Sequence, residues 1–179
     1  MPNTPPLPFP HSYWVIPGKL MAGYYPGHVE SEKAHLQLQA LYDCGIRHFI
    51  NLMEEDERNY QGQLFNPYVE DFRAIAVKRG ETVSFSRYPI RDGGLPSPDT
   101  MRAILDEIDA ELAAGKAVYV HCWGGKGRTG TVVGCYLARH GTPPETILDR
   151  IIELRKGIQP YAESPENNAQ RQFVLNWKE

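Results

Sequence analysis

Residues 117 to 130 read AVYVHCWGGKGRTG, and this stretch decides the fold. The apolar run from Ala117 to Val120 predicts a buried strand. Glycines at positions 124, 125 and 127 predict a tight loop, because glycine adopts backbone conformations that other residues avoid. A helix is expected to begin near Arg128. A strand that passes through a short loop into a helix is typical of α/β proteins.

The rest of the chain continues this alternation. Strands are predicted over residues 13–16, 20–23, 48–52, 82–88 and 117–120. Helices are predicted over residues 32–44, 66–79, 97–115, 128–140, 143–154 and 165–177, and four of them start at Asn66-Pro67, Ser97-Pro98, Thr142-Pro143 and Ser164-Pro165. We therefore expect an α/β fold with a mostly parallel central sheet of about four to five strands and helices on both faces.

The length of the chain indicates one domain over residues 13–179, preceded by a proline-rich N-terminal arm over residues 1–12. With a net charge of -3 and no basic stripe, the composition argues against a nucleic-acid partner. The three cysteines show neither CxxC nor zinc spacing, so we expect reduced thiols in a cytoplasmic protein, with no metal and no cofactor. No membrane span or secretory leader is predicted. The oligomeric state is left open, and a monomer is favoured.

The loop after Val120 has the composition of an anion site. A loop at a helix N-terminus presents unpaired N–H groups and the positive end of the helix dipole. Gly124, Gly125 and Gly127 allow several of these N–H groups to converge. Arg128 adds a planar fork that matches two phosphate oxygens. In this field we expect Cys122 to be a thiolate, which indicates phosphoryl transfer through sulfur.

Three other interpretations of this loop are weaker. Residues 125–130 match GxGxxG, but no second strand that ends in an acidic residue follows about twenty residues later. The nucleotide P-loop requires Ser or Thr after its lysine, whereas Gly127 follows Lys126. If Cys122 were an ordinary buried thiol, the high glycine content of the loop that follows it would have no explanation.

Because sites in such folds lie beyond the carboxyl ends of the strands, the loop after Tyr88 should lie beside the loop after Val120. This places Asp92 near Cys122. The segments HCWGGKGRTG (121–130), YPIRDGGLP (88–96) and SPENNAQ (164–170) together resemble those of the cysteine-dependent protein tyrosine phosphatase superfamily. The compact dual-specificity branch, including small bacterial and archaeal-type members, is the most similar. The signature loop also lies two-thirds along the chain, as it does in that branch.

The resemblance implies a role for each site residue. Cys122 would be the nucleophile, Arg128 would bind phosphate oxygens, and Asp92 would be the general acid. In supporting roles, His121 would order the loop, Thr129 would donate a hydrogen bond to the departing thiolate or cap the helix, and Gln170 would position water. The phosphate-binding residues would be Trp123, Gly124, Gly125, Lys126, Gly127 and Arg128.

We therefore expect a metal-independent phosphomonoester hydrolase that forms a cysteinyl-phosphate. Its substrate would be a phosphorylated protein, carrying phosphotyrosine and also phosphoserine or phosphothreonine, or a small phosphomonoester. A phosphoinositide or inositol-phosphate phosphatase is the alternative, since Lys126 adds a second cation to the loop. A phosphate-binding module without turnover is a third hypothesis, but binding alone requires neither a nucleophile nor an acid.

Overall fold

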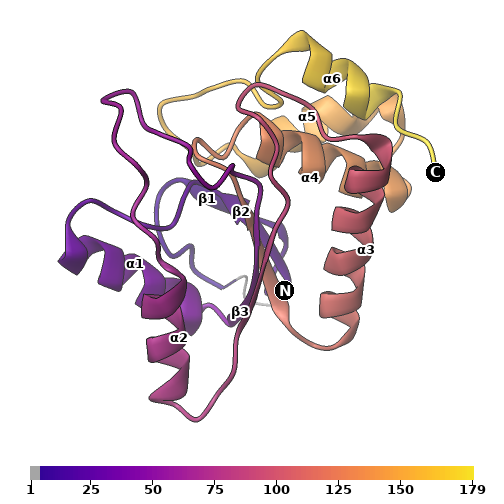
Figure 1. The fold of residues 1–179 in the computed structure, drawn as a ribbon. Coiled ribbons are helices and arrows are strands. Elements are labelled where there is room, and N and C mark those ends of the chain that lie inside the picture. The colour runs from indigo at the N-terminus through magenta and orange to yellow at the C-terminus, as the bar shows by residue number, and fades with distance from the viewer. Residues whose placement is uncertain (1–4) are drawn as a thin grey trace.

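A computed structural model describes residues 5–179 as a five-stranded sheet with helices on both faces (Figure 1). The strands are β1 (Ser12–Ile16), β2 (Leu20–Gly23), β3 (Ile46–Asn51), β4 (Ser84–Arg87) and β5 (Ala117–His121). The helices are α1 (Ser31–Asp43), α2 (Val69–Val77), α3 (Pro98–Ala113), α4 (Arg128–Arg139), α5 (Pro144–Leu154) and α6 (Asn168–Leu175). The predicted α/β class is confirmed.

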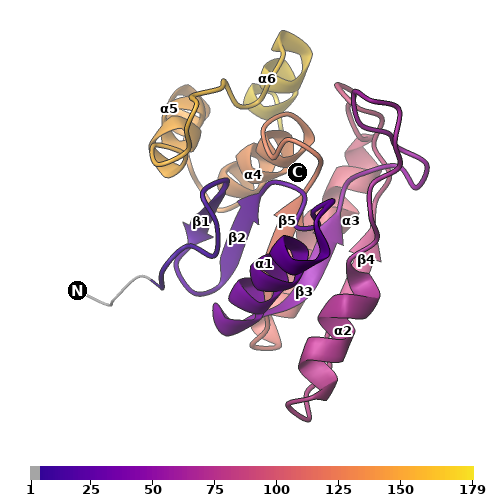
Figure 2. The ribbon, with the colours of Figure 1, turned by 90° about the vertical axis from the view of Figure 1, so that its left-hand side faces the viewer.

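The strand order is β1-β2-β5-β3-β4, which Figure 2 shows from one edge of the sheet to the other. β1 and β2, at the two strands predicted first in the chain, form an antiparallel hairpin, and every other neighbouring pair is parallel. β5 therefore lies at the centre of the sheet, and all five of its residues are buried. This position explains its apolar sequence, because a central parallel strand is covered on both faces.

The helices form two layers, with α1 and α2 on one face and the other four helices on the opposite face (Figures 1 and 2). On the first face, Phe49 of β3 meets Phe72 of α2, with the ring centroids 4.6 Å apart. On the second face, α3 buries Ile104 and Ile108. The start of α3 is also confirmed, since the Ser97 side chain accepts a hydrogen bond from the backbone N–H of Thr100.

The predicted start of α2 at Asn66-Pro67 is wrong, because the helix begins at Val69. Proline disfavours helical backbone at the residue before it, and the Asn66 side chain donates to the carbonyl of His28 instead of capping a helix. The helix also ends before the predicted Arg79.

Two further start signals mark the wrong residue. Pro143 is extended, with φ -61° and ψ 141°, because the following Pro144 excludes helical backbone there, so α5 begins at Pro144. α6 begins at Asn168, three residues beyond the predicted Pro165. Asn167 caps this helix, while the Ser164 hydroxyl is engaged elsewhere and donates to the carbonyl of Lys126.

The predicted N-terminal arm, residues 1–12, falls partly outside the described residues. Within its described part, the ring of Phe9 packs against Tyr119 and is buried in the core. The carbonyl of Pro5 accepts a hydrogen bond from Nε1 of Trp14. The boundary between arm and domain stays a prediction.

Candidate active site

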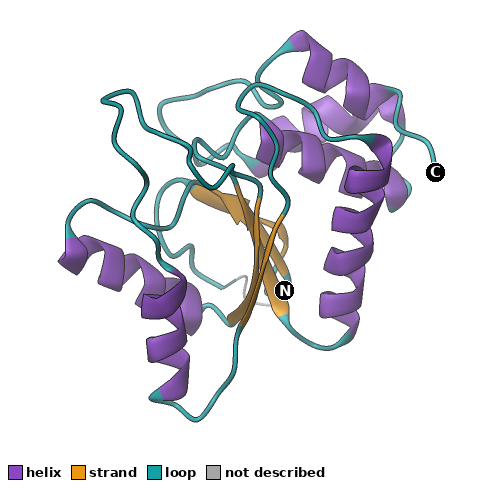
Figure 3. Cartoon of the chain, viewed as in Figure 1, coloured by secondary structure: helices purple, strands orange, loops and turns teal. Residues whose placement is uncertain are grey.

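The glycine-rich loop lies at the carboxyl end of β5, next to the loop that follows β3, and the loop that follows β4 comes next along the same edge. Parallel strands bring these ends to one edge of the sheet, where the loops gather (Figure 3). Backbone hydrogen bonds join them: Leu52 N–H donates to the carbonyl of His121, and Ile90 N–H donates to the carbonyl of Leu52. The loop that carries Asp92 is thereby fixed to the centre of the sheet.

The carbonyl groups of the glycine-rich loop are held from outside. His121 Nδ1 bonds the carbonyl of Cys122, and Tyr25 N–H bonds that of Trp123. Arg155 Nη1 bonds the carbonyl of Gly125 at 2.6 Å. The carbonyls of Lys126 and Gly127 accept from Ser164 and Thr131. Because N–H and C=O point in opposite directions across a trans peptide, the N–H groups that follow these carbonyls turn toward the inside of the loop.

Gly125 is required by close approach. It has φ +61°, and a Cβ atom at this position would lie 2.4 Å from the carbonyl carbon of Gly23. A side chain here would therefore push the loop away from the backbone beside it. At Gly127 a Cβ atom would lie 2.9 Å from a carboxylate oxygen of Glu166, and the end of that side chain can move aside.

The loop encloses a pocket of about 180 Å³. The pocket brings together most of the residues that the sequence predicted for the site. It is lined by Tyr24, Tyr60, Asp92, Cys122, Trp123, Gly124, Lys126, Gly127, Arg128 and Glu166. Of the predicted phosphate-binding residues, only Gly125 does not line the pocket, and it shapes the loop from behind. His121, Thr129 and Gln170 also lie behind the lining residues.

Cys122 lies at the bottom of this pocket, with only 2% of its surface exposed. The hydroxyl of Thr129, in the first turn of α4, donates a hydrogen bond to its sulfur at 3.1 Å. The sulfur therefore has a fixed donor beside it, in addition to the N–H groups of the loop and the positive end of α4.

The guanidinium of Arg128 is almost completely buried, with 1% of the side chain exposed. Glu57 holds it by two hydrogen bonds, of 2.6 and 2.8 Å, and Asp92 accepts a third at 2.9 Å. Burial is the largest influence and opposes the charge of Arg128, but the hydrogen bonds to Glu57 and the negative charges nearby together outweigh it, so the pKa is raised. Glu57 does not line the Cys122 pocket, so it orients the arginine from the far side.

The Nε–H of Arg128 is buried without a partner among residues 5–179. A buried donor of this kind is costly, which makes it a ready site for an anion. Asp92 lines the pocket beside it, and 60% of its side chain is exposed.

The loop that carries Asp92 is also held by the start of α6. Asn167 Nδ2 donates to the carbonyl of Gly93, and Gln170 Nε2 donates to that of Gly94. Gln170 Oε1 accepts from the N–H of Glu166, so both ends of the amide have protein partners. Gln170 thus lies between the loop that carries Asp92 and Gly127. Its predicted role in positioning water stays a prediction.

His121 is buried beneath the loop. Its Nδ1 donates to the carbonyl of Cys122, and its Nε2 accepts from the Tyr68 hydroxyl at 2.5 Å. Burial lowers the pKa of His121 to about 3, so the ring is neutral near pH 7. Burial likewise raises the pKa of Tyr68, which remains a hydroxyl donor.

Trp123 and Lys126 stand at the rim. Trp123 packs against Tyr60, with the ring centroids 4.4 Å apart. Lys126 Nζ lies 2.7 Å from a carboxylate oxygen of Glu166, and this hydrogen bond raises its pKa. The second cation that the sequence indicated is therefore paired within the protein.

The sequence analysis missed Tyr24, Tyr60 and Glu166 of the pocket lining. It also missed three residues that hold the loop: Glu57, Tyr68 and Arg155. Glu57 lies between the strand predicted over residues 48–52 and the helix predicted over residues 66–79, and Arg155 follows the last residue of a helix. None of the three carries a spacing signal, because each reaches the loop from a segment remote in sequence.

Residues 5–179 contain no helix of the length and hydropathy that crossing a bilayer requires. In the same range, no group of three or more His, Cys, Asp or Glu side chains is arranged to hold a metal ion.

Residues 10–173 match the family described as "PTP-SAK: Swiss Army Knife protein, DSP-PTPase phosphatase domain". The chain belongs to this family. The predicted relationship to the dual-specificity phosphatases is thereby confirmed.

Known proteins support this assignment. Over 132 residues, which is 71% of the chain, it is 30% identical to "Dual specificity protein phosphatase CDC14AB" of Danio rerio. Over 123 residues, or 68% of the chain, it is 30% identical to "Phosphatidylglycerophosphate phosphatase PTPMT1" of Arabidopsis thaliana. The chain spans only 19% and 32% of the lengths of these relatives.

Among solved structures, the active form of Tk-PTP superposes with a TM-score of 0.65 at 23% identity. The match covers 93% of this chain and 95% of the Tk-PTP chain. At this identity the similarity establishes a shared fold.

Proposed function

We propose that this PTP-SAK domain hydrolyses phosphomonoesters through a cysteinyl-phosphate intermediate, with a phosphorylated protein as its substrate. One observation carries the proposal: Cys122 and Arg128 of the glycine-rich segment line a single pocket together with Asp92, which comes from the loop after β4. A nucleophile, an anion clamp and an acid are the three groups that this reaction requires.

In the first step the Cys122 thiolate attacks phosphorus, and the bond from phosphorus to the ester oxygen breaks. The inward N–H groups of the loop and the free Nε–H of Arg128 would bind the phosphoryl oxygens. In the structure, Nη2 of Arg128 donates a hydrogen bond to Asp92, and a phosphoryl oxygen would replace Asp92 as the acceptor. Released from Arg128, Asp92 would take up a proton from solvent and donate it to the leaving oxygen.

In the second step water attacks the phosphocysteine. Asp92, now ionised, accepts a proton from this water, and the bond from sulfur to phosphorus breaks. The Thr129 hydroxyl, 3.1 Å from the sulfur, stabilises the thiolate as it leaves. Gln170 lies close enough to the loop to orient the attacking water, once its amide exchanges a protein partner for the water. Inorganic phosphate then leaves, and the enzyme returns to its starting state.

A phospholipid or inositol-phosphate substrate is the second candidate. The name of the Arabidopsis thaliana relative is that of a lipid phosphatase, and Lys126 offers a second cation at the pocket. The pairing of Lys126 with Glu166 counts against this candidate, because a second phosphate would have to break that ion pair. We therefore favour a phosphorylated protein.

The test is hydrolysis of a small aryl phosphate in the presence of EDTA. Cys122→Ser should abolish turnover and retain phosphate binding. Cys44→Ser, at a half-buried thiol remote from the pocket, should leave turnover unchanged. Normal turnover by Cys122→Ser would refute the sulfur mechanism. If the unaltered chain binds phosphate without turnover, it is a phosphate-binding module.

The role of Asp92 has a separate test. Asp92→Asn should slow the hydrolysis of alkyl phosphates far more than that of aryl phosphates, because only a poor leaving group needs the proton. Asp99→Asn is the matched control, since 95% of this side chain is exposed and it lies in the first turn of α3. Equal losses on both substrates would identify another acid.

A further inference from the structure

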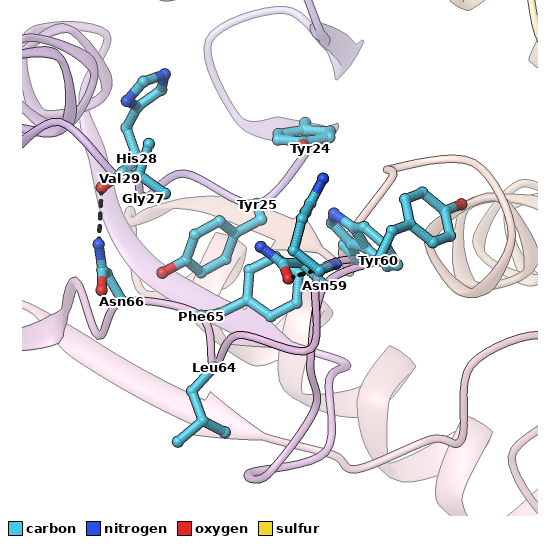
Figure 4. Close-up of a pocket in the computed structure, with 12 residues that line it drawn as sticks. Tyr24, Tyr25, Gly27, His28, Val29, Asn59, Tyr60, Leu64, Phe65 and Asn66 are labelled. Atoms are coloured by element: carbon cyan, nitrogen blue, oxygen red, sulfur yellow. Dashed lines mark hydrogen bonds between the residues drawn. The ribbon is translucent and has the colours of Figure 1, made fainter.

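A second and larger pocket, of about 360 Å³, is drawn in Figure 4 and shares lining residues with the Cys122 pocket, here called the phosphate pocket. Tyr24, Tyr60 and Trp123 line both pockets, so these three rings form a shared wall. A group held in the second pocket would therefore touch the same side chains as the phosphorylated residue. The mechanism above makes no use of this space.

The second pocket is aromatic and carries no charge that could bind phosphate. Tyr25 and Phe65 meet at its centre, with the ring centroids 4.9 Å apart (Figure 4). Of the residues within 5–179 that line it, none is Asp, Glu, Lys or Arg. A pocket lined by rings with a few uncharged polar groups is typical of a site for a neutral, apolar ligand.

Exposed apolar side chains surround this pocket. Val29 is 75% exposed, Leu64 is 53% exposed and Tyr60 is 90% exposed. Single exposed apolar residues are ordinary, but three around one pocket are typical of a binding surface. Two of them, Leu64 and Tyr60, lie in the segment between β3 and α2, which also carries Glu57.

The charge of this segment favours a peptide over a membrane lipid. Residues 54–57 read Glu-Glu-Asp-Glu, and Glu55 and Asp56 are exposed. Such a cluster repels an anionic membrane surface. The amides of Gln61 and Asn66 also line the second pocket and can bond a peptide backbone, and the Asn66 oxygen can accept while its nitrogen donates to the carbonyl of His28.

We propose that the second pocket is a specificity subsite that takes an apolar side chain of the phosphorylated protein, close in sequence to the phosphorylated residue. This inference rests on the proposed phosphatase function. Because successive residues of an extended peptide are about 3.5 Å apart, the apolar side chain should lie within about three residues of the phosphorylated one. Leu64 and Val29 would contact it without touching the phosphate.

The experiment compares phosphotyrosyl peptides that carry either leucine or serine at each position near the phosphotyrosine, with a small aryl phosphate as reference. The aryl phosphate fills only the phosphate pocket and reports the basal activity. We expect leucine at one position to raise kcat/KM about tenfold over serine, which is the discrimination typical of a modest apolar pocket.

The double variant Val29→Ser/Leu64→Ser should reduce this preference to about threefold or less and leave hydrolysis of the aryl phosphate unchanged. Val77→Ser is the matched control, because Val77 is 72% exposed in α2 and lines neither pocket. Since all three side chains are exposed, these substitutions should preserve the fold.

The outcomes separate the subsite from the enzymatic activity. Turnover of the aryl phosphate with no preference for leucine at any position would refute the subsite and leave the proposed function standing. A lipid phosphomonoester could instead have a higher kcat/KM than every peptide, and this preference could disappear in the double variant. That result would show that the second pocket binds an acyl chain, and the peptide proposal would be wrong. Absence of aryl phosphate turnover would refute the function and the subsite with it.

Discussion

Glu57→Gln tests whether the buried carboxylate holds Arg128 in place. The carboxylate makes two charge-assisted hydrogen bonds to the guanidinium, and both side chains are less than a tenth exposed, at 8% and 1%. The amide keeps one acceptor but turns a donor toward Arg128. Loss of a charged hydrogen bond costs about 1.5–3 kcal/mol, and breaking a buried pair costs about 3–5 kcal/mol. We therefore expect a loss of about 3 kcal/mol in the free energy of unfolding.

This loss should lower the Tm by about 6–12 °C in a protein of this size. Without the Glu57 carboxylate, only Asp92 and the carbonyl of Ile90 hold the guanidinium, which would lose its fixed orientation toward a phosphoryl group. We expect kcat/KM for a small aryl phosphate to fall about a hundredfold, which is the effect of misplacing a group at the reacting centre by about 1 Å. Denaturant unfolding and steady-state kinetics measure the two effects.

Glu55→Gln is the matched control, because it removes the same charge from an exposed position in the same loop. It should change the stability by less than about 0.5 kcal/mol and leave kcat/KM near that of the unaltered protein. If Glu57→Gln behaves in the same way as this control, the ion pair contributes neither stability nor orientation, and the argument fails.

Three further predictions concern the groups that hold the loop. Tyr68→Phe should lower the free energy of unfolding by about 1–3 kcal/mol, because it leaves Nε2 of the buried His121 without a donor; an unchanged urea midpoint would contradict this. Because burial lowers the pKa of His121 to about 3, the unfolded chain binds a proton near pH 6.5 that the folded protein does not. The free energy of unfolding should therefore fall as the pH decreases from 6.5 toward 3, by at most about 1.4 kcal/mol per pH unit. Measured at pH 7, 6 and 5, it should fall less steeply with pH for His121→Gln than for the unaltered protein. Gly125→Ala should weaken binding of inorganic phosphate in calorimetric titration, because its Cβ would lie 2.4 Å from the carbonyl carbon of Gly23; binding equal to that of the unaltered protein would show that the loop tolerates the change.

The elements themselves could be predicted because their signals are local. Apolar runs placed β3 and β5, and helical spacing with Ser97 placed α3, so each element lies close to its predicted range. The starts of α2, α5 and α6 were misplaced, because a residue before proline or a side chain with a remote partner overrides a capping pattern.

The sequence by itself determined the fold class and the residues of the glycine-rich loop, because strand, glycines and helix start are contiguous and each depends on local backbone preference. It also predicted that Asp92 approaches Cys122, from the rule that parallel strands end at one edge of the sheet.

Only the tertiary structure decided what holds the loop and what lies beside it. Glu57, Tyr68 and Arg155 reach it from three separate segments, and the aromatic pocket forms where residues after β2, β3 and β5 meet. The physical reason is that these contacts join buried side chains far apart in sequence. Partners of this kind are selected by the packing of the whole sheet and its loops, and no spacing within one segment records them.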